Sequence, residues 1–431
     1  MAVNSLSGLE IGIPTTQQYR DLGRDIFLCA SPAIRTFKPL QKGDTQSNQI
    51  QVVDFFSGAG GTSLGFYALN SLGDIFHFLG GCDIDPNSAA SYSANFGTPL
   101  LCRNIIEVAS SNAEIDSFLG EIGYNRNEPS IFIGCAPCQG FTSHRKRHWS
   151  EKDDERNVLA TAFARIVKRA NPTALIMENV PEFLSQKYRS YYRECIEMLE
   201  SAGYLVKKTI YNSAAFGVPQ ERYRSIIIGM KTEFCLPDDI YNISEFKTVR
   251  DAISDLPPLS AGESSPDPLH KAIRHKASTI ETIRKVPHNG GSLPDGEGPA
   301  CRARVKGFAD VYGRLSWDKP SITITHYARN PASGRFVHPV QDRGLTAREA
   351  ARLQSFPDGF HFCGRSDDVY RQIGEAVPPL LACGMASYLL ANLLKSTFSD
   401  LEIAQSRPSI EEPVSNSYSS VIAGMKLRRK Q

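Results

Sequence analysis

The sequence predicts an α/β fold built on a mixed, largely parallel sheet, with a second and smaller domain. Short apolar runs rich in β-branched and aromatic residues recur along the chain, for example at 50–56 and 174–177. Several of these runs end at glycine or at an acidic residue, and helical patterns follow them. The length of 431 residues leaves room for a large core and two domains.

Composition predicts a soluble, cytoplasmic protein. Hydrophobic residues make up 41% of the chain and charged residues 22%. No run approaches eighteen apolar residues, and the N-terminus lacks a basic segment followed by an apolar one, so we expect neither a membrane span nor a signal peptide. The ten cysteines have no repeating spacing, so we expect reduced thiols and no metal site.

The first predicted strand, 50–56, runs into a glycine-rich turn at 57–61, and a helix follows. This order brings backbone amides close to a nucleotide-like ligand. Ser63 stands where the third glycine of a dinucleotide fingerprint would be, so a dinucleotide is not the favoured ligand. Asp83 and Asp85 follow the second strand, about 20 positions after the turn, where such folds hold ribose hydroxyls. The alternative for either aspartate is to cap the next helix.

A buried strand at 131–133 leads into the loop that contains Cys135, Pro137 and Cys138. Three interpretations of this loop compete. The cysteines can be small buried apolar residues. They can form a C-x-x-C redox pair or half of a zinc site, although the chain has no second C-x-x-C. In the third interpretation Cys138 is a lone nucleophile that needs a proton-handling partner elsewhere.

Later strands supply polar groups that such a nucleophile needs. A buried strand ends at Glu178, which lies at the same sheet edge as Cys138 if both strands are parallel. Gln220, Arg222 and Arg224 alternate at strand spacing. We therefore expect these three side chains to project to one face, toward a planar polar ligand or a phosphate.

From about 231 to 340 the pattern changes, because proline, glycine, serine and histidine become frequent and regular helices scarce. Between Glu263 and Glu349, 14 Lys and Arg stand against 9 Asp and Glu. This excess favours a surface for a polyanion, although a solvated face with uneven charge explains the count equally well.

Seven motifs in order make the chain resemble the S-adenosylmethionine-dependent DNA (cytosine-5)-methyltransferases from about residue 50 to 395. They are Asp54-Phe55-Phe56-Ser57-Gly58-Ala59-Gly60-Gly61, Pro137-Cys138-Gln139-Gly140, Asp154-Glu155-Arg156-Asn157, Glu178-Asn179-Val180, Gln220-Glu221-Arg222-Tyr223-Arg224, Arg348-Glu349-Ala350-Ala351-Arg352-Leu353-Gln354 and Gly374-Glu375-Ala376-Val377-Pro378-Pro379. The resemblance implies a Rossmann-like class I methyltransferase sheet with a smaller, loop-rich target-recognition domain. It also implies transfer of a methyl group from S-adenosyl-L-methionine to C5 of a cytosine flipped out of a specific duplex sequence.

The resemblance assigns the catalytic roles. Cys138 would add to C6 of the base and leave by elimination after C5 has taken the methyl group and lost its proton. Glu178 would supply a proton or a hydrogen bond at N3, with a raised pKa in a closed site. Arg224 would bind O2 of the base, and Arg222 would support the site.

The resemblance also assigns binding residues. The cofactor would lie against Phe56, Ser57, Gly58, Ala59, Gly60 and Gly61 at its methionine part, Asp83 at the ribose with Ile84 beside it, Asn104 and Ile105 near the adenine, and Pro137, Leu159, Glu375, Ala376 and Val377. DNA would contact Gln139, Ser143, Arg145, Arg147 and Gln220, and most of these lie in a basic loop able to close over a phosphate backbone.

Four positions depart from the family's usual residues: Asp83 replaces Glu, Asn104 replaces Asp, Thr142 replaces Ser and Glu375 replaces Asn. Asp83 can still accept ribose hydroxyls, and the carbonyl of Asn104 can accept from the adenine amino group. The Glu375 carboxylate stands where an amide normally bonds. We therefore expect weaker cofactor binding, but no loss of it.

We expect an N-terminal extension (1–48), a catalytic and cofactor-binding domain (49–230), a target-recognition domain (231–340), a return segment that completes the catalytic domain (341–395) and a disordered tail (396–431). This organisation suggests a bacterial or phage modification enzyme that acts as a monomer on double-stranded DNA, with a cognate restriction endonuclease acting separately. The alternatives are an RNA (cytosine-5)-methyltransferase and a catalytically inactive DNA-binding regulator. Gly140 and the large variable module argue against the first, and the intact catalytic residues argue against the second.

Overall fold

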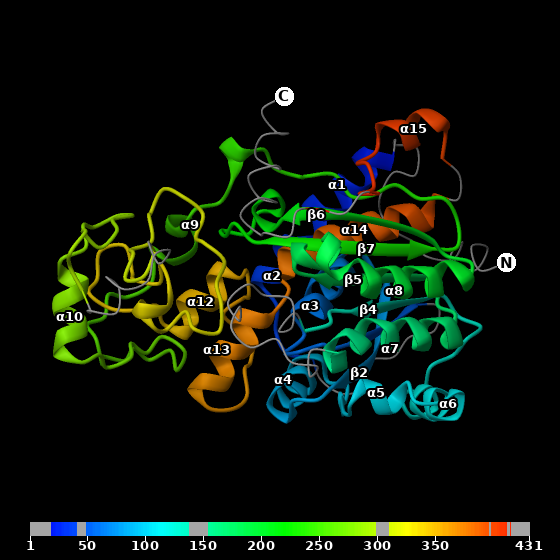
Figure 1. Cartoon of the computed structure of the whole chain (residues 1–431), viewed down its shortest axis with the longest axis horizontal. Helices are drawn as coiled ribbons and strands as arrows, with labels where there is room; N and C mark the ends of the chain where they lie inside the picture. The colour runs from blue at the N-terminus through cyan, green and yellow to red at the C-terminus, as the bar shows by residue number, and fades with distance from the viewer. Residues whose placement is uncertain are drawn as a thin grey trace.

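The computed structural model describes residues 19–40, 49–137, 154–298, 310–395, 398–411 and 414. Within these residues seven strands form one sheet in the order β3-β2-β1-β4-β5-β7-β6 (Figure 1). The strands are β1 (Ile50–Phe55), β2 (Phe76–Asp83), β3 (Leu101–Cys102), β4 (Ser130–Gly134), β5 (Ala174–Asn179), β6 (Leu205–Asn212) and β7 (Tyr223–Met230). Neighbouring strands are parallel except where β7 pairs with β5 and with β6. The predicted mixed, largely parallel sheet is confirmed.

Helices cover both faces of the sheet, so this part of the molecule has three layers. One face carries α1 (Tyr19–Ala30), α3 (Gly61–Tyr67), α4 (Pro86–Phe96) and α14 (Pro379–Leu394), and the other carries α5 (Ile105–Val108), α6 (Asn112–Glu121), α7 (Asp154–Ala170) and α8 (Arg189–Ser201). The remaining α-helices in the described ranges are α2 (Pro32–Arg35), α9 (Val249–Ile253), α10 (Ala277–Arg284), α12 (Ala347–Leu353), α13 (Ser366–Glu375) and α15 (Asp400–Gln405). Figure 1 shows α9, α10 and α12 in a second lobe beside the sheet.

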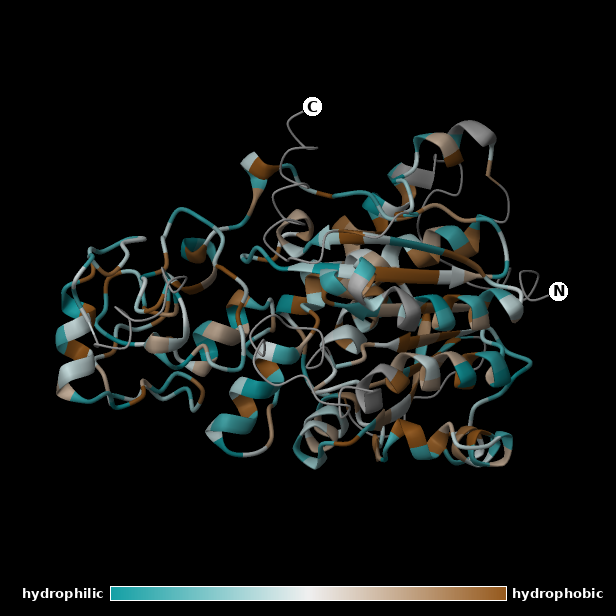
Figure 2. Cartoon of the chain, viewed as in Figure 1, coloured by the Kyte–Doolittle hydropathy of each residue, from teal (hydrophilic) through white to brown (hydrophobic). Residues whose placement is uncertain are grey.

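The central strands are buried on both faces. Successive side chains of a strand point to opposite sides, so Val52 packs in one core and Val53 in the other, and Ile131 and Phe132 divide in the same way. All residues of β1 are buried. A strand covered on both faces favours apolar residues at most positions, which explains the apolar runs of the sequence, and the buried Gln51 and Asp54 of β1 are exceptions. Figure 2 shows hydrophobic strands in the interior of the sheet domain.

Helix α14 brings the C-terminal part of the chain back onto the sheet through close contact with α3. A Cβ atom added at Gly65 would lie 2.5 Å from the Cβ of Ala382 and 2.5 Å from the carbonyl oxygen of Pro379. A Cβ at Gly61 would overlap the carbonyl oxygen of Val377. Only glycine permits this approach of two backbones, and the contact carries residues 375–377 to the glycine-rich turn.

The helix α1 covers α14 from outside. A Cβ added at Gly23 would lie 2.6 Å from the ring of Tyr388, and Phe27 packs edge-on against Phe216. The N-terminal extension, for which the sequence suggested no role, therefore buries part of α14. By length and composition the segment Ser366–Leu394 resembles a membrane span, but 89% of its most apolar window is buried inside the protein.

Buried arginine side chains stabilise the second lobe, which has little regular secondary structure. The side chain of Arg314 is fully buried and donates to carbonyl oxygens of Ile283, Val286, His338 and Gln341. Arg343 makes two hydrogen bonds, of 2.8 and 2.7 Å, to the carboxylate of Glu349 in α12. A guanidinium group with five donors satisfies carbonyl groups that have no helix or ladder partner, which allows a loop-rich core.

Residues 398–411, which we expected to be part of a disordered tail, form α15 and an extended segment beside β6. The amide of Ile410 donates to the carbonyl oxygen of Lys208 at 2.7 Å, and Arg407 pairs with Asp239 at 2.8 Å. The expectation of disorder is wrong for these residues. Their polar sequence gives no sign of this contact with the sheet, because it is made largely through backbone groups of the edge strand β6 and needs no apolar pattern.

Replacement of Gly65 by alanine is expected to lower the free energy of unfolding by about 1–3 kcal/mol, because the new methyl group overlaps α14. Urea denaturation followed by circular dichroism measures the change. Gly120→Ala in α6 is the matched control, since a Cβ there meets no atom within 4 Å. The control should stabilise the protein by up to about 1 kcal/mol. Equal effects of the two changes would contradict the packing argument.

Candidate active site and cofactor cavity

The carboxyl ends of β1, β4 and β5 form the centre of the candidate site. In the sheet, Phe55 pairs with Gly134, and Gly134 pairs with Met177. The glycine-rich turn after β1, the loop that begins at Cys135 and the side chain of Glu178 therefore leave the sheet at one level. Open α/β sheets bind ligands at this edge. Cys138 itself lies outside the described residues, as do Gln139, Ser143, Arg145 and Arg147.

The turn after β1 has a left-handed backbone at three positions. Phe56 has φ of 56°, Gly58 has φ of 54° and Gly60 has φ of 97°. An added Cβ at Gly58 would meet no described atom within 4 Å, so this position faces open space. Ser57 is buried, and none of the described residues hydrogen-bonds its hydroxyl oxygen. The turn thus offers one hydroxyl without a partner among the described residues, beside a space that a ligand can enter.

The two aspartates after β2 have different roles. Asp85 caps α4 by accepting from the backbone amide of Ser88 at 2.9 Å. Asp83 accepts from the backbone amide of Gly58 at 2.8 Å through Oδ2, and from the amide of Asp85 at 2.8 Å through Oδ1. Asp83 therefore fixes the glycine-rich turn against β2, and each of its oxygens already serves one backbone donor.

Asp54 is a buried carboxyl group beneath the turn, and the sequence analysis gave it no role of its own. Its Oδ2 accepts from the hydroxyl of Ser63 at 2.7 Å, and the Ser63 oxygen lies 3.0 Å from the hydroxyl of Tyr92. Oδ1 has no partner among the described residues. Burial raises the pKa of Asp54 to about 7 against the opposing effect of the Ser63 hydrogen bond. The signal available in the sequence was an acidic residue inside an apolar strand.

Glu178 and Arg224 form an ion pair at the end of β5. Arg224 Nε lies 2.7 Å from Glu178 Oε1, and the two side chains are 10% and 12% exposed. The antiparallel register pairs Glu178 with Ile226 and Asn179 with Ser225, which puts Arg224 just beyond the end of β5. Burial raises the pKa of Glu178, and the positive charges of Arg224 and Arg222 oppose that shift. A proton on this carboxyl group is therefore easier to add than on an exposed glutamate.

Arg222 connects parts of the chain that are distant in sequence. Its Nη1 donates to the carbonyl oxygen of Ile324 at 3.0 Å, and its Nη2 donates to the carbonyl oxygen of Gly374 at 3.1 Å. The side chain of Gln220 is fully buried and bonds to Leu353, Gln354 and Ile324. The amide group of Gln220 is therefore enclosed and already hydrogen-bonded inside the protein, which disfavours the predicted contact with DNA.

Cys135 occupies the space between Glu178 and the helix after the turn. Its Sγ lies 3.4 Å from the hydroxyl oxygen of Thr62. Burial raises the pKa of the Cys135 thiol, and the negative charges of Glu178 and Asp54 raise it further. A thiol that stays protonated is a poor nucleophile and a poor redox partner, so the geometry favours a packing role for Cys135.

Asn179 holds the start of the loop that leads to Cys138. Its Nδ2 donates to the carbonyl oxygen of Ala136 at 3.2 Å, and its Oδ1 accepts from the amide of Val180 at 2.8 Å. Asn179 belongs to one of the seven motifs but had no predicted function of its own. The amide group acts as a brace between the ends of β4 and β5, so Asn179 is a positioning residue for the loop.

A cavity of about 390 Å³ lies beyond Asp83. Its lining residues are Ile84, Cys102, Arg103, Asn104, Glu107, Val108 and Glu114. Ile84 is 70% exposed, which offers an apolar surface to a planar ring. Asn104 caps α5 and presents its side chain to the cavity. Ile105, predicted to lie near the adenine, is instead buried in the core and does not line the cavity.

The other predicted cofactor residues differ in their burial and in their distance from the glycine-rich turn. Val377 is buried against the turn through Gly61, and Ala376 is half-buried beside it. Glu375 and Pro137 are exposed, whereas Leu159 is half-buried against the second core. Of these residues, Ala376 and Val377 meet the glycine-rich turn from a distant part of the sequence.

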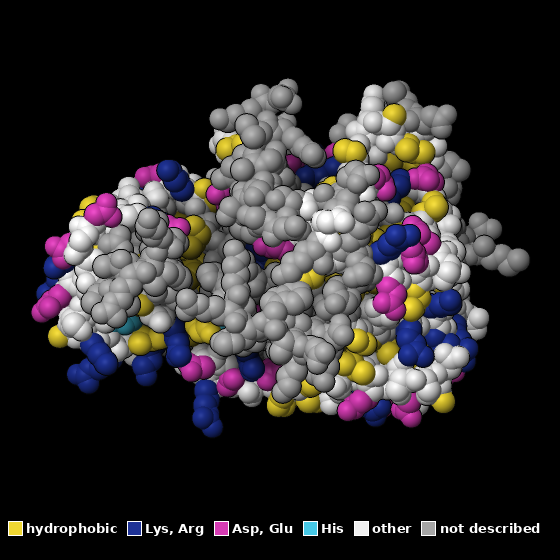
Figure 3. All heavy atoms as spheres, viewed as in Figure 1, with side chains coloured by type: hydrophobic (Ala, Val, Ile, Leu, Met, Phe, Trp, Pro, Cys, Tyr) yellow, Lys and Arg dark blue, Asp and Glu magenta, His cyan; other side chains and the backbone are white. Residues whose placement is uncertain are grey.

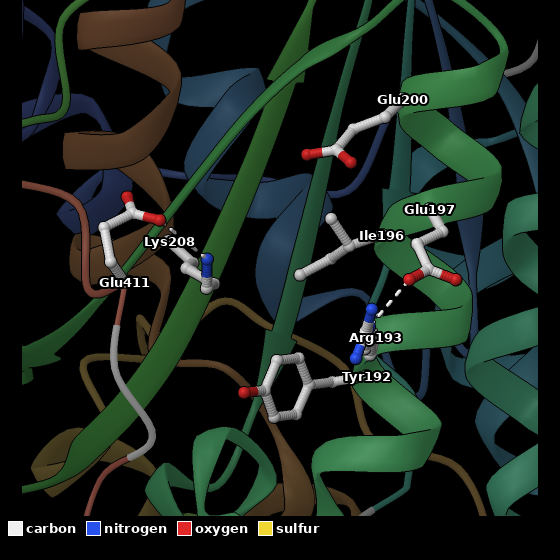
Figure 4. A pocket seen from close by; sticks show the side chains of 7 residues that line it. All are labelled: Tyr192, Arg193, Ile196, Glu197, Glu200, Lys208 and Glu411. Atoms are coloured by element: carbon white, nitrogen blue, oxygen red, sulfur yellow. Dashed lines mark hydrogen bonds and ion pairs between the residues drawn. The ribbon is translucent and has the colours of Figure 1, made fainter.

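A smaller cavity of about 190 Å³ lies between α8, β6 and the C-terminal segment (Figure 4). Arg193 pairs there with Glu197 at 2.7 Å, and Lys208 with Glu411 at 3.8 Å. Within the described ranges no group of three or more His, Cys, Asp or Glu residues could hold a metal ion. Nothing in this cavity points to a ligand.

The sheet with its single reversed strand, and the site at its carboxyl edge, define a class I methyltransferase. A crystal structure of an E. coli prophage-encoded DNA modification methyltransferase matches at a TM-score of 0.57 and 26% identity, covering 80% of this chain and 99% of that one. The Dnmt2 methyltransferase of S. pombe shares the fold at a TM-score of 0.52 and 18% identity, covering 80% and 98%.

The chain belongs to the C-5 cytosine-specific DNA methylase family, whose model matches residues 50–390. It is 37% identical to the type II methyltransferase M1.HphI of Haemophilus parahaemolyticus, over 78% of this chain and 86% of the relative. It is 32% identical to the type II methylase M.HgiDII of Herpetosiphon aurantiacus, over 77% and 92%. The protein is therefore a DNA (cytosine-5-)-methyltransferase, and the prediction made from the ordered motifs is confirmed over its alternatives.

Asp54→Asn should change the pH dependence of stability. The pKa of Asp54 is about 7 in the folded protein against 3.8 for an ordinary aspartate, so the folded state binds more protons between these values. The free energy of unfolding of the wild type therefore falls as pH rises from about 4 to 7. The asparagine variant lacks this pH-dependent loss. The difference in free energy of unfolding between the variant and the wild type should therefore shift in favour of the variant by on the order of 2–4 kcal/mol between pH 4 and pH values above 7.

Urea denaturation of both proteins at about pH 4.5 and 6, within that window, and at about pH 8, above it, measures the difference. Ser63→Ala is a useful companion, because it removes the hydrogen bond that partly opposes the pKa shift. Parallel stability curves for the wild type and Asp54→Asn would show that Asp54 does not titrate in this range.

Proposed function

We propose that this enzyme is the modification methyltransferase of a restriction-modification system and methylates cytosine within one short sequence of double-stranded DNA. The observation that carries the proposal is the buried pair of Glu178 and Arg224, joined at 2.7 Å at the sheet edge from which the loop to Cys138 departs. The relatives named type II methyltransferases support the modification role. The cognate endonuclease would act separately on the same sequence.

The chemistry requires a nucleophile and a proton donor on opposite parts of one base. The thiolate of Cys138 adds to C6, which moves electrons through the ring and makes C5 able to attack a methyl group. Glu178 holds a proton at N3 while that charge develops, because burial raises its pKa. Once C5 carries the methyl group, its proton passes to solvent, the C5–C6 double bond forms again as the thiolate leaves, and the N3 proton returns to Glu178. Arg224 keeps the carboxyl group of Glu178 oriented and contacts O2 of the base.

Arg222 acts on the site without contacting the base. By bonding to the carbonyl oxygens of Ile324 and Gly374, it joins the recognition lobe to the return segment next to the site. We assign it a positioning role, because both Nη groups already have partners in the protein. Its charge also helps Arg224 to moderate the pKa of Glu178.

The residues around the turn suit S-adenosyl-L-methionine, which supplies the methyl group on a sulfonium centre. The unpartnered hydroxyl of Ser57 and the open space at Gly58 can receive the amino-acid part. Asp83, although it already binds two amides, has further lone pairs for ribose hydroxyls. Ile84 and Asn104 line the cavity that would take the purine.

DNA would lie between the two lobes, with the target cytosine flipped into the site. Exposed basic side chains of the recognition lobe include Lys271, Arg274, Lys276, Arg284 and Lys285. Figure 3 shows Lys and Arg side chains projecting from this lobe, where they can pair with phosphates. We propose a monomer in the cytoplasm, with specificity supplied by the loops of the recognition lobe.

Glu178→Gln should reduce methyl transfer by about 100-fold or more, because the amide cannot pass a proton to N3. Cys138→Ala should abolish transfer. Bisulfite sequencing of DNA from cells that express each variant measures the product and reveals the target sequence. Glu233→Gln is the control, since Glu233 is an exposed residue that pairs with Lys207. The proposal fails if Cys138→Ala still marks DNA, or if the folded wild type marks none.

Glu375→Asn is expected to tighten binding of S-adenosylhomocysteine by about three- to tenfold, because an amide can both donate and accept where a carboxylate only accepts. Isothermal titration without DNA measures this change. Glu375→Gln separates the loss of charge from side-chain length. An unchanged or weaker affinity of Glu375→Asn would show that the glutamate is not a handicap to the cofactor site.

A further inference from the structure

Asn104 caps α5 in a way that fixes the orientation of its amide group. Its backbone is extended, with φ of −78° and ψ of 122°, and its Oδ1 accepts from the amide of Ile106 at 3.0 Å. A helix cap needs an acceptor, so the oxygen must face Ile106, and the two ends of the amide cannot be exchanged. The free end of Asn104 is then Nδ2, which only donates.

This free end belongs to a side chain that lines the cavity of about 390 Å³. No described residue accepts a hydrogen bond from Nδ2. The other charged side chains on the cavity wall are ion-paired or exposed to solvent. Arg103 pairs with Glu121 at 2.6 Å, and Glu107 and Glu114 are exposed. Hydrogen bonds to such solvated carboxylates add little net affinity, so Asn104 offers the best placed polar contact.

Adenine presents a donor and an acceptor side by side, the 6-amino group and the ring nitrogen N1. An aspartate at the cap would use its second oxygen to accept from the amino group. An asparagine whose Oδ1 faces Ile106 instead turns the hydrogens of Nδ2 toward the ligand, and these repel the amino group and match N1. This reverses the expectation that the Asn104 carbonyl accepts from the adenine amino group.

We infer that Asn104 makes the cavity recognise the purine of the cofactor by donating to N1, so that the 6-amino group contributes little. The inference rests on the proposed function, because it takes the purine of S-adenosyl-L-methionine to occupy this cavity. Its consequence is a cofactor site with relaxed selectivity at position 6 and strict selectivity at position 1.

Two analogues of S-adenosylhomocysteine test this directly in the wild-type protein by isothermal titration without DNA. The 1-deaza analogue lacks the N1 acceptor, and its dissociation constant should rise by about tenfold. The 6-deamino analogue lacks the amino group, and its dissociation constant should change by less than about threefold. No methyl transfer is needed for either readout.

Asn104→Asp keeps the cap and replaces the free donor with an acceptor, so the order of the two analogues should reverse. Asn330→Asp is the matched control, because Asn330 also caps a short helix, η9 (Pro331–Ser333), through an Oδ1 bond of 3.0 Å to Ala332, and does not line the cavity. The control should leave both ratios unchanged. A reversal in the control as well would overturn the assignment to Asn104.

The outcomes separate the inference from the proposed function. If S-adenosylhomocysteine itself fails to bind the folded wild type, the cofactor assignment fails and the inference falls with it. If it binds, but loss of the amino group weakens binding more than loss of N1, the cofactor assignment stands and the inference alone is overturned.

Discussion

The contact between α3 and α14 is the constraint on which the architecture of the site depends. Gly65 lets the backbones of the two helices approach closely, and Gly61 admits the segment just before α14. Through this contact the return segment closes one layer of the sheet domain and brings Ala376 and Val377 to the glycine-rich turn. The same turn is held from the other side by Asp83, so it is fixed between a helix and a strand.

Charge at the site is set by burial and by strand direction together. Because β7 runs antiparallel beside β5, it delivers Arg224 to the end of the strand that carries Glu178. The positive charge of Arg224 offsets the free-energy cost of burying the charged carboxylate of Glu178. Burial at the same time raises the pKa of that carboxyl group, so it is easily protonated. A parallel strand at this place would carry its arginine away from the site, so the reversed strand is part of the chemistry.

The sequence was sufficient for the strands, their shared edge and the reaction class, because apolar runs and ordered motifs are local signals. It was insufficient where the outcome depended on which polar atom binds which backbone group. Gln220 lies two residues before Arg222, as side chains on one face of a strand do, but its amide group is hydrogen-bonded to the backbone of Ile324 and Leu353. Asn104 could be placed near a ligand, whereas the orientation of its amide depended on the cap to Ile106. The docking of residues 398–411 depended on an edge strand whose exposure no local pattern reveals.

The return of α14 to α3 also affects how the enzyme can be made. Residues 379–394 pack against a helix made more than three hundred positions earlier, and α1 in turn packs on α14. A nascent chain that has emerged only as far as β7 holds every strand of the sheet but lacks α14, the helix that completes the layer formed by α1, α3 and α4 on one face. The ribosome must therefore deliver the whole second lobe before α14 can complete the sheet domain, so that both lobes fold late and together.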